Sequence, residues 1–449
     1  MEARNPADTE DVRRLIDALQ RLGWYHSIEL PSGDVIEGIQ TLPQLRQRIA
    51  QFPLPENLTG KRVLDIGAWD GWFSFEMERR GARVLAIDNA RRTRFLKARE
   101  LLNSRVEYRI ADICRSAARD LGRFDIVLFF GVLYHLKHPM LALERVCDLA
   151  TDLALVESYV TDDGSRLDGP PVMEFYETTE FLGQFDNWVG PNTSCLLAMC
   201  RTAGFARVEL RSVIAHRAHV ACYRKWPAVV PTAPAPGLIC VENSVSRDHE
   251  FSAEADNYVS FWVRCAERDL NADSVFPEIG GYGVRPSEVH PSSEEGWLVN
   301  AKLPPGLDPG WYLARLRVRE SAFSNAVRIA VDLPVEERRR FAGPRAEGLR
   351  IHSVTDGRTF AESRVRAGED ACMSMWAAGL PDGVTAERLA LRLDGTDLPA
   401  TWVSAPDGDG LRQINALLPP GIPPGRVQVA LALDGDETAP VDVNLIEAL

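Results

Sequence analysis

The stretch that most constrains the fold is VLDIGAWDGW, residues 63–72, in which an apolar run ends at a turn bounded by two glycines. The run, the turn and the helical pattern of FSFEMERR behind it predict a buried strand, a tight turn and an amphipathic helix. In open α/β sheets such a turn lies against a nucleotide-type cofactor. Ala68 and Trp69 stand where a dinucleotide fingerprint needs small residues, so a ligand without a pyrophosphate fits better.

Short apolar strands alternate with helical segments from Lys61 to about Tyr223. This alternation predicts a Rossmann-like, doubly wound parallel sheet of the α/β class. Asn192 or Thr193 can cap a helix through CLLAMCRTA that Gly204 ends, and two closely spaced strands then form an antiparallel pair.

Carboxylates follow the first three strands of this predicted sheet. Asp88 ends ARVLAID, at the height where a ribose diol is usually held, and Asp65 can offset ammonium and sulfonium charge. Asp112 and Ile113 can meet an adenine edge. Together these positions indicate S-adenosylmethionine. The predicted cofactor contacts are Asp65, Gly67, Ala68, Trp69, Asp70, Gly71, Asp88, Asn89, Asp112, Ile113, Phe130 and Gly131.

The exit of the fourth strand, FDIVLFFGVLYHLKHP, carries the predicted catalytic residues. Gly131 frees the backbone at the carboxyl end of the strand, so Tyr134 and His135 project near the methyl-transfer site. His135 can take a proton from a hydroxyl or amine nucleophile, or it only hydrogen-bonds the loop. His138 precedes a proline at a helix start, which favours a structural role.

The acceptor pocket is predicted from segments outside the cofactor motifs. Trp24, Tyr25 and His26 form either a lid over the cofactor or a hydrophobic plug for the N-terminus. Glu157 can hold an acceptor hydroxyl or cap the next loop. The long acidic and aromatic segment 161–191 is of a length typical of functional covers, or its aromatics simply pack. Its candidate residues are Glu174, Tyr176, Asn187 and Trp188.

The net charge of −13 is unevenly distributed. Residues 1–230 hold 30 Lys and Arg against 31 Asp and Glu, whereas the remainder holds 21 against 33, a net charge of −12. An acidic field repels polyanions, so nucleic-acid binding requires a local basic patch. The segment 90–99 is the candidate, either as a solvated helix face or as an anion site, with Arg91, Arg92, Arg94, Lys97 and Arg99.

Neither a leader-like apolar stretch nor a membrane-spanning run is evident, which favours a cytoplasmic protein without a membrane partner. Eight cysteines show no spacing typical of metal ligands, so we expect free thiols and no metal.

The segment WPAVVPTAPAPG, residues 226–237, has four prolines and predicts a linker to a different architecture. Short alternating strands beyond it predict two immunoglobulin-like β-sandwiches in tandem. An internal repeat supports this: VNAKLPPGLDPG matches INALLPPGIPPG, the segment around Trp262 matches that around Trp376, and ENSVS around Val245 is aligned with IHSVT around Val354. The predicted boundaries are 1–60 for an N-terminal segment or lid, 61–225 for the catalytic domain, 226–237 for the linker, and 238–335 and 345–449 for the sandwiches.

GAWDGWFSFEMERRGARVLAID, FFGVLYHLKHPMLALERV, LALVES and NWVGPNTSCLLAMCRTAGFARVEL resemble the class I methyltransferases grouped with tRNA wobble-uridine (mo5U34) enzymes. The resemblance covers residues 20–225. It implies S-adenosylmethionine bound through Asp65, Gly67, Asp88, Asp112 and Gly131, with Tyr134 near the transferred group. In that group carboxymethyl is carried on carboxy-S-adenosylmethionine, but Trp24 to Leu30 offers no lysine for its carboxylate, so we expect ordinary methyl transfer.

The sequence therefore predicts an S-adenosylmethionine-dependent methyltransferase acting on oxygen or nitrogen of a small-molecule or glycan-like acceptor. The alternatives are tRNA wobble-uridine modification, and an inactive scaffold that binds a partner or glycan. The sandwiches can position a substrate, form a homo-oligomer or stabilise the catalytic domain.

Overall fold

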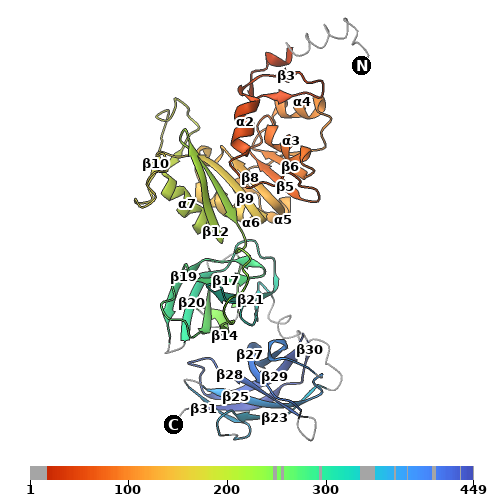
Figure 1. Ribbon diagram of the computed structural model, residues 1–449, viewed down its shortest axis with the longest axis vertical. Helices are drawn as coiled ribbons and strands as arrows, with labels where there is room; N and C mark the ends of the chain where they lie inside the picture. The colour runs from red at the N-terminus through yellow and green to blue at the C-terminus, as the bar shows by residue number, and fades with distance from the viewer. Residues whose placement is uncertain are drawn as a thin grey trace. The chain divides into compact units, whose positions relative to one another are not determined.

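The computed structural model describes residues 18–245, 250–253, 257–292, 296–333, 349–359, 361–368, 371–381, 383–406, 411–434 and 436–447 (Figure 1). The start of the predicted N-terminal segment, and the stretch between the two predicted sandwiches, lie outside these residues. The chain divides into two compact units, Met1–Lys225 and Trp226–Leu449.

The first unit is built on a seven-stranded sheet in the order β12-β13-β9-β8-β5-β6-β7. The five strands from β7 to β9 are parallel, as the alternation of strands and helices predicts, and β13 pairs antiparallel with both β9 and β12. All carboxyl ends of the parallel strands therefore meet at one edge. The strands are β5 (Arg62–Ile66), β6 (Arg83–Asp88), β7 (Glu107–Ile110), β8 (Phe124–Phe130), β9 (Ala150–Tyr159), β12 (Arg207–Ile214) and β13 (Arg217–Tyr223).

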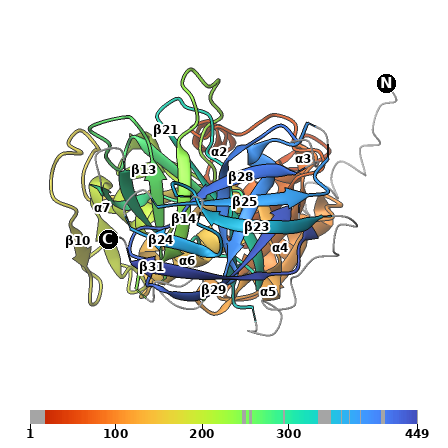
Figure 2. The same ribbon diagram turned by 90° about the horizontal axis from the view of Figure 1, so that it is seen from below.

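Helices cover both faces of this sheet (Figures 1 and 2). Side chains of α6 and α7 belong to the core on one face, and those of α2, α3 and α4 to the core on the other. Asn192 is the N-cap of α7, where its side chain accepts from the Cys195 amide at 2.8 Å, and Gly204 follows with φ +109°. The helices are α2 (Leu42–Ile49), α3 (Trp72–Arg79), α4 (Thr93–Leu101), α5 (Ala118–Leu121), α6 (Pro139–Leu149) and α7 (Thr193–Thr202), with the 3-10 turns η1 (Ile113–Arg115) and η2 (Leu133–His135).

Two irregular segments adjoin the sheet. Ahead of it, β1 (Trp24–His26) pairs in parallel with β4 (Gly38–Gln40), and β2 (Ile28–Glu29) pairs with β3 (Val35–Ile36). Between β9 and α7 the chain forms a short antiparallel pair, β10 (Met173–Phe175) with β11 (Val189–Pro191). We call residues 161–191 the cover segment.

The second unit begins with an all-β domain of two sheets. One has the order β14-β16-β20-β19 and the other β15-β22-β21-β17-β18. Side chains from both sheets form a single hydrophobic core, which the alternation of buried and exposed positions predicts. The strands are β14 (Gly237–Asn243), β15 (Glu250–Phe251), β16 (Tyr258–Arg264), β17 (Val275–Ile279), β18 (Tyr282–Gly283), β19 (Pro286–Pro291), β20 (Gly296–Lys302), β21 (Gly310–Val318) and β22 (Val327–Val331).

The second all-β domain repeats this strand order. The path β23-β25-β28-β27 corresponds to the first sheet and β24-β31-β29-β26-β27 to the second. Strand β27 serves both sheets, because its first half pairs with β26 and its second half with β28. The strands are β23 (Arg350–Asp356), β24 (Arg364–Ala367), β25 (Cys372–Ala378), β26 (Leu389–Leu393), β27 (Thr396–Val403), β28 (Arg412–Leu417), β29 (Gly425–Leu433), β30 (Asp436–Glu437) and β31 (Val441–Glu447).

Strand register fixes which residues of the two repeats correspond. Trp262 and Trp376 hold equivalent places, opposite β14 and β23. The alignment of Val245 with Val354 is wrong: Val245 lies in an exposed turn after β14, whereas Val354 is buried in β23. The true counterpart is Val241, four residues earlier, which is buried at the same register position.

All eight cysteines are free thiols. Among the helices of the described residues, none has the length and apolar character needed to cross a membrane.

Candidate active site

The turn after β5 uses two left-handed glycines. Gly67 has φ +73°, and a Cβ there would lie 2.4 Å from Cγ2 of Val132. Gly71, at φ +93°, is the N-cap of α3, and a Cβ on it would meet the rings of Phe75 and Phe95 at 2.7 Å. Both positions therefore need glycine for conformation and for space. The turn lies directly against the exit of β8, which contributes Val132.

Asp65 lies one residue before the end of β5 and is almost fully buried. Its carboxylate accepts a hydrogen bond from the Ser74 hydroxyl at 2.6 Å. Burial raises the pKa of Asp65 to about 7, and the nearby Asp88 charge adds to that rise, while the Ser74 hydrogen bond opposes it. A cationic ligand beside this carboxylate would favour its ionised form.

Asp88 ends β6 beside the same turn. Its Oδ2 accepts from the Trp69 amide at 3.2 Å and its Oδ1 from Nε of Arg92 at 2.8 Å. The Arg92 guanidinium in turn lies 4.0 Å above the Trp69 ring. The indole nitrogen of Trp69 is buried and has no hydrogen-bond partner among the described residues. A buried donor without a partner can hydrogen-bond a ligand. Together with the Asp88 carboxylate and the two glycines, the Trp69 indole N–H fits a site for a nucleoside-bearing cofactor.

Other predicted cofactor residues have structural partners. The Asp70 carboxylate accepts from the amides of Tyr25 and His26, at 2.7 and 3.2 Å, and pairs with Arg94 at 2.9 Å. The structure thus uses Asp70 to fasten β1 to the turn. Asp112 caps η1 through the Cys114 amide. Ala68, Ile113 and Phe130 are buried, and the side chain of the exposed Asn89 accepts from Arg92.

The exit of β8 is held by the cover segment. Gly131 has φ +70°, and a Cβ on it would meet the Tyr134 hydroxyl at 3.4 Å. The Trp188 amide donates to the Tyr134 carbonyl at 2.7 Å. Nδ1 of His135 lies 3.0 Å from the Asp186 carbonyl oxygen. Burial lowers the pKa of His135, although Asp186 opposes this, and the lowered pKa favours the neutral imidazole.

A buried ionic cluster borders Gly131, and two of its members, Arg48 and Arg217, were not predicted from the sequence. Glu157, in β9, is only 1% exposed, and its Oε2 accepts from Nη2 of Arg48 at 2.8 Å. Nη1 of Arg217, at the start of β13, lies 3.4 Å from Oε1 of Glu157 and donates to the Tyr134 hydroxyl at 2.8 Å. Arg48 comes from α2, which precedes the sheet in sequence, so elements far apart in the chain build this ionic cluster.

Two neutral histidines complete the cluster. Burial and the charge of Arg48 lower the pKa of His26 to about 3. Burial also lowers the pKa of His219, which lies on β13 directly opposite Glu157 of β9 in the strand register. Nδ1 of His26, Nε2 of His219 and Oε1 of Glu157 are buried without hydrogen-bond partners among the described residues. With two arginines and one carboxylate, the cluster offers several polar atoms to a ligand at the carboxyl edge of the sheet.

The remaining predicted acceptor residues are mostly packed. Trp24 is 2% exposed and its indole donates to the Leu19 carbonyl at 2.8 Å, as a plug would. Tyr25 is half-buried, and its hydroxyl accepts from Gln40. In the cover segment, Tyr176 donates to Glu174 at 2.8 Å and stacks on Phe181. The buried Asn187 donates to the Phe181 carbonyl, and Trp188 lies beneath Lys137.

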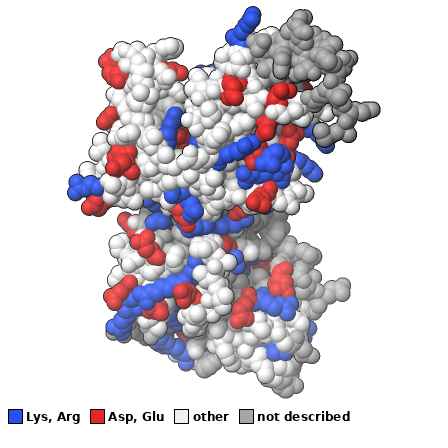
Figure 3. All heavy atoms as spheres, turned by 45° about the horizontal axis from the view of Figure 1, so that its top comes forward, with Lys and Arg blue, Asp and Glu red and all other residues white. Residues whose placement is uncertain are grey.

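The basic segment before and within α4 is largely engaged in the fold. Arg92 pairs with Asp88, Arg94 with Asp70 and Lys97 with Glu100. The Arg99 guanidinium donates to the Val106 carbonyl. On the face shown in Figure 3, basic side chains lie among acidic ones and do not form one continuous basic surface. These contacts favour the structural interpretation of this segment over an anion site.

The sheet and its turn define a class I methyltransferase domain, whose cofactor is S-adenosylmethionine. Residues 38–209 match the family model described as Methyltransferase domain. That match runs from β4 to the start of β12 and includes the turn after β5 and the exit of β8, whereas β1 and β13 lie outside it.

Relatives extend the comparison over parts of the chain. It is 39% identical over 92 residues to a ubiquinone biosynthesis O-methyltransferase of Xanthomonas campestris pv. campestris, covering 20% of this chain and 38% of the relative. It is 30% identical over 174 residues to a tRNA U34 carboxymethyltransferase of Pseudomonas paraeruginosa, covering 36% and 52%. The chain thus spans between about two fifths and one half of these curated relatives.

Two solved structures align over a larger share of this chain than these relatives do. The N-terminal domain of EvdMO1 with SAH bound is 22% identical and aligns with a TM-score of 0.36 over 48% of this chain and 95% of that domain. An S-adenosylmethionine-dependent methyltransferase from Mesorhizobium loti is 17% identical, with a TM-score of 0.33 over 40% and 96%.

Proposed function

We propose that this protein transfers a methyl group from S-adenosylmethionine to oxygen or nitrogen of a small-molecule or glycan-like acceptor. The observation that carries the proposal is the meeting of three features at one sheet edge. These are the Gly67 turn with its orphaned Trp69 donor, the Asp65 and Asp88 carboxylates, and the Gly131 exit beside the Glu157 cluster. A partial match to an O-methyltransferase supports a small acceptor.

The cofactor would supply a methyl carbon open to in-line attack. This chain's residues would then act by binding and orientation, which dominate when two reactants are held in attacking geometry. Asp65 and Asp88 would hold the cofactor. Glu157, Tyr134 and Arg217 would orient the acceptor against Gly131, since their polar atoms surround that glycine.

His135 is the proposed general base. The Asp186 carbonyl 3.0 Å from Nδ1 favours the tautomer with the proton on Nδ1, which leaves Nε2 free to accept the acceptor's proton. In H135Q we expect kcat to fall by about 10²-fold to 10⁴-fold with little change in KM. H138Q, at the N-cap of α6, is the matched control. Labelled methyl transfer to a panel of phenols and monosaccharides is the assay.

Calorimetry with S-adenosylhomocysteine tests the cofactor site without an acceptor. We expect the double variant D65A/G67V to lose measurable binding. The control D125A/G60V changes a partly buried carboxylate outside the proposed site and a left-handed glycine with open space around it. Unchanged affinity in D65A/G67V would show that the assigned cradle is wrong.

Modification of tRNA is the second candidate, because a tRNA U34 carboxymethyltransferase matches over 174 residues. The acidic second unit and the internal pairing of the basic segment weigh against it. Salt-dependent retention of total tRNA by the intact protein, together with label transfer to it, would replace the small-acceptor proposal.

We further propose that both β domains are immunoglobulin-like. In the first domain the order β14-β16-β20-β19 corresponds to strands A-B-E-D of that fold, and β22-β21-β17 corresponds to its G-F-C. The second domain has the equivalent orders β23-β25-β28-β27 and β31-β29-β26. We propose a cytoplasmic location from the eight free cysteines.

The proposed roles of the two β domains are to present a glycan-like acceptor or to form a homo-oligomer. Light scattering on the intact protein tests for the homo-oligomer.

A further inference from the structure

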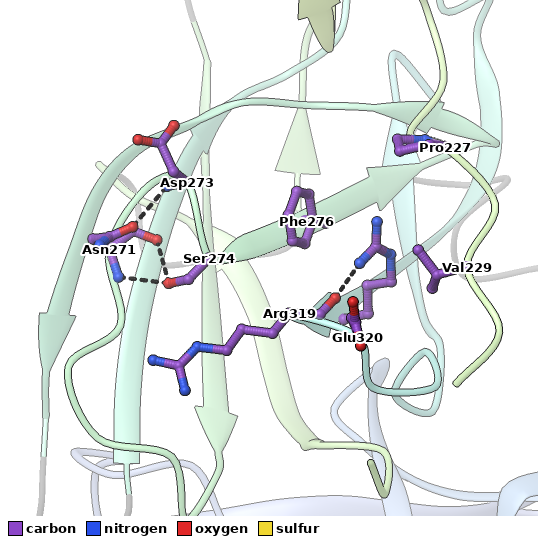
Figure 4. A pocket seen from close by; sticks show the side chains of 9 residues that line it. Pro227, Val229, Asn271, Asp273, Ser274, Phe276, Arg319 and Glu320 are labelled. Carbon is purple, nitrogen blue, oxygen red and sulfur yellow. Dashed lines mark hydrogen bonds between the residues drawn. The ribbon is translucent and has the colours of Figure 1, made fainter. Parts of the chain in front are cut away.

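The first β domain carries a pocket of about 540 Å³ that no part of the proposed reaction uses (Figure 4). It lies within the unit Trp226–Leu449. This volume falls in the range of roughly 300–1,000 Å³ that small-molecule sites occupy. Its lining includes two basic residues, Arg317 and Arg319, two acidic residues, Asp273 and Glu320, and the apolar Val229 and Phe276.

Arg317, on β21, is the unusual member of the lining. The residue is 3% exposed, and its guanidinium lies 4.0 Å from the centre of the Phe276 ring. One of its terminal nitrogens donates to the backbone oxygen of Arg319, but Nε has no partner among the described residues. Within the same residues no carboxylate forms an ion pair with it. A buried guanidinium without a counter-charge is costly.

Arg315 provides a comparison on the same strand. It lies two residues earlier, so both side chains leave the same face of β21. Its guanidinium also stacks on an aromatic ring, that of Phe323 at 4.3 Å, but it pairs with the Glu278 carboxylate at 2.6 Å. The more exposed arginine thus has a carboxylate partner, and the buried one lacks it. Burial lowers the pKa of Arg317, and the Glu320 carboxylate offsets only part of that effect.

The second β domain indicates that the fold does not require this arginine. Phe276 and Arg317 are directly opposite each other on β17 and β21. The equivalent pair on β26 and β29 is Ala390 and Ala432. Both domains build the same two sheets, so the Arg–Phe pair serves a purpose particular to the first domain.

We propose that this pocket binds a small organic anion, whose carboxylate or phosphate pairs with Arg317 and whose apolar part lies against Phe276 and Val229. Guanidinium groups pair with such planar or tetrahedral anions in fork geometry, and the aromatic ring beneath holds the guanidinium in place. The proposal is independent of the methyl-transfer reaction.

The test uses calorimetry on the intact protein at low ionic strength, with glucuronate, glucose 6-phosphate and glucose. The two anionic sugars are expected to bind at least about tenfold more tightly than glucose. Whichever anion binds more tightly identifies the group, carboxylate or phosphate. Equal binding of all three sugars, or no binding of either anion, overturns the proposal.

Two variants locate the site. R317Q is expected to weaken anion binding by about tenfold or more, whereas R315Q stays within about twofold of the wild type. V229E places a carboxylate in the pocket from a position already 36% exposed, and it should weaken anion binding to a similar degree without removing a buried side chain. Anion affinity unchanged in R317Q or in V229E contradicts the assignment.

Discussion

Gly67 is restricted both by its left-handed backbone conformation and by the close approach of Val132. Replacing it with alanine should cost about 1–2 kcal/mol for the left-handed backbone and about 1–3 kcal/mol for the contact with Val132, 2.4 Å from the added Cβ. G60A has a similar φ, +82°, but open space around the Cβ, so only the backbone cost applies. Urea denaturation measures both. Equal losses in the two variants would mean that Val132 moves aside freely.

Asp65 makes stability depend on pH in an unusual direction. Its folded pKa of about 7 exceeds its ordinary 3.8, so between these values the folded protein binds more protons than the unfolded chain. The free energy of unfolding contributed by this group therefore falls as pH rises from about 4 to about 7. Relative to the wild type, D65N should be more stable at pH 8 than at pH 5.

Asp125 supplies a control of opposite sign. Partial burial opposes the change, but hydrogen bonds from the Arg62 amide and Lys61 lower its pKa. Its stabilisation is present above the ordinary carboxyl range and is lost as pH falls through the folded pKa. D125N should therefore lose stability relative to the wild type at pH 8, and less so at low pH. Urea midpoints at the two pH values decide both cases.

The sequence located several carboxylates but not their partners. Asp65, Asp88 and Asp112 could be placed at or near strand ends from the sequence, because the apolar periodicity indicates where each strand stops. Asp70, in the turn after β5, is also predicted to contact the cofactor, yet its carboxylate accepts from two β1 amides and pairs with Arg94. The contacts with β1 span 44 and 45 residues and the contact with Arg94 spans 24, and no local sequence pattern encodes them.

At the scale of elements, α2 offers two arginines in contrasting environments. Arg48 pairs with the buried Glu157, and Arg46 with the exposed Glu29. R48Q should lower the free energy of unfolding by about 3 kcal/mol, because one partner of a buried pair is lost. R46Q should change it by about 0–1 kcal/mol. Chemical denaturation of both variants is the measurement, and similar losses would contradict a special role for the Glu157 contact.

The parallel direction of the strands was predictable where strands and helices alternate, since a helix carries the chain back to the end of the sheet from which the next strand starts. The order of the strands was not predicted. The repeat was also visible in the sequence, but its correct alignment near Val245 was not. ENSVS and IHSVT share a Ser-Val pair, whereas strand pairing aligns Val354 with Val241, four residues before Val245. Register with Phe261 and Met375 corrects it. The same register places a serine opposite an asparagine in both domains, and the serine donates to the asparagine, Ser260 to Asn300 at 2.7 Å and Ser374 to Asn415 at 2.8 Å.

At the scale of the whole molecule, each unit has hydrophobic cores of its own. A chain ending at Lys225 should therefore fold and bind S-adenosylhomocysteine within about twofold of the full-length affinity. Circular dichroism and calorimetry test this. A truncated chain that folds but binds much more weakly would show that the second unit contributes to the cofactor site.

The ion pair between Arg48 and Glu157 has a consequence for synthesis. Its partners are 109 residues apart, and the third member of the cluster, Arg217, emerges from the ribosome later still. Contacts of such separation form late, because the intervening loop must close first. Arg48 therefore has no partner from the cluster until β9 has been translated. The cluster of Arg48, Glu157 and Arg217 is complete only after translation has reached β13, the last strand of the sheet in chain order.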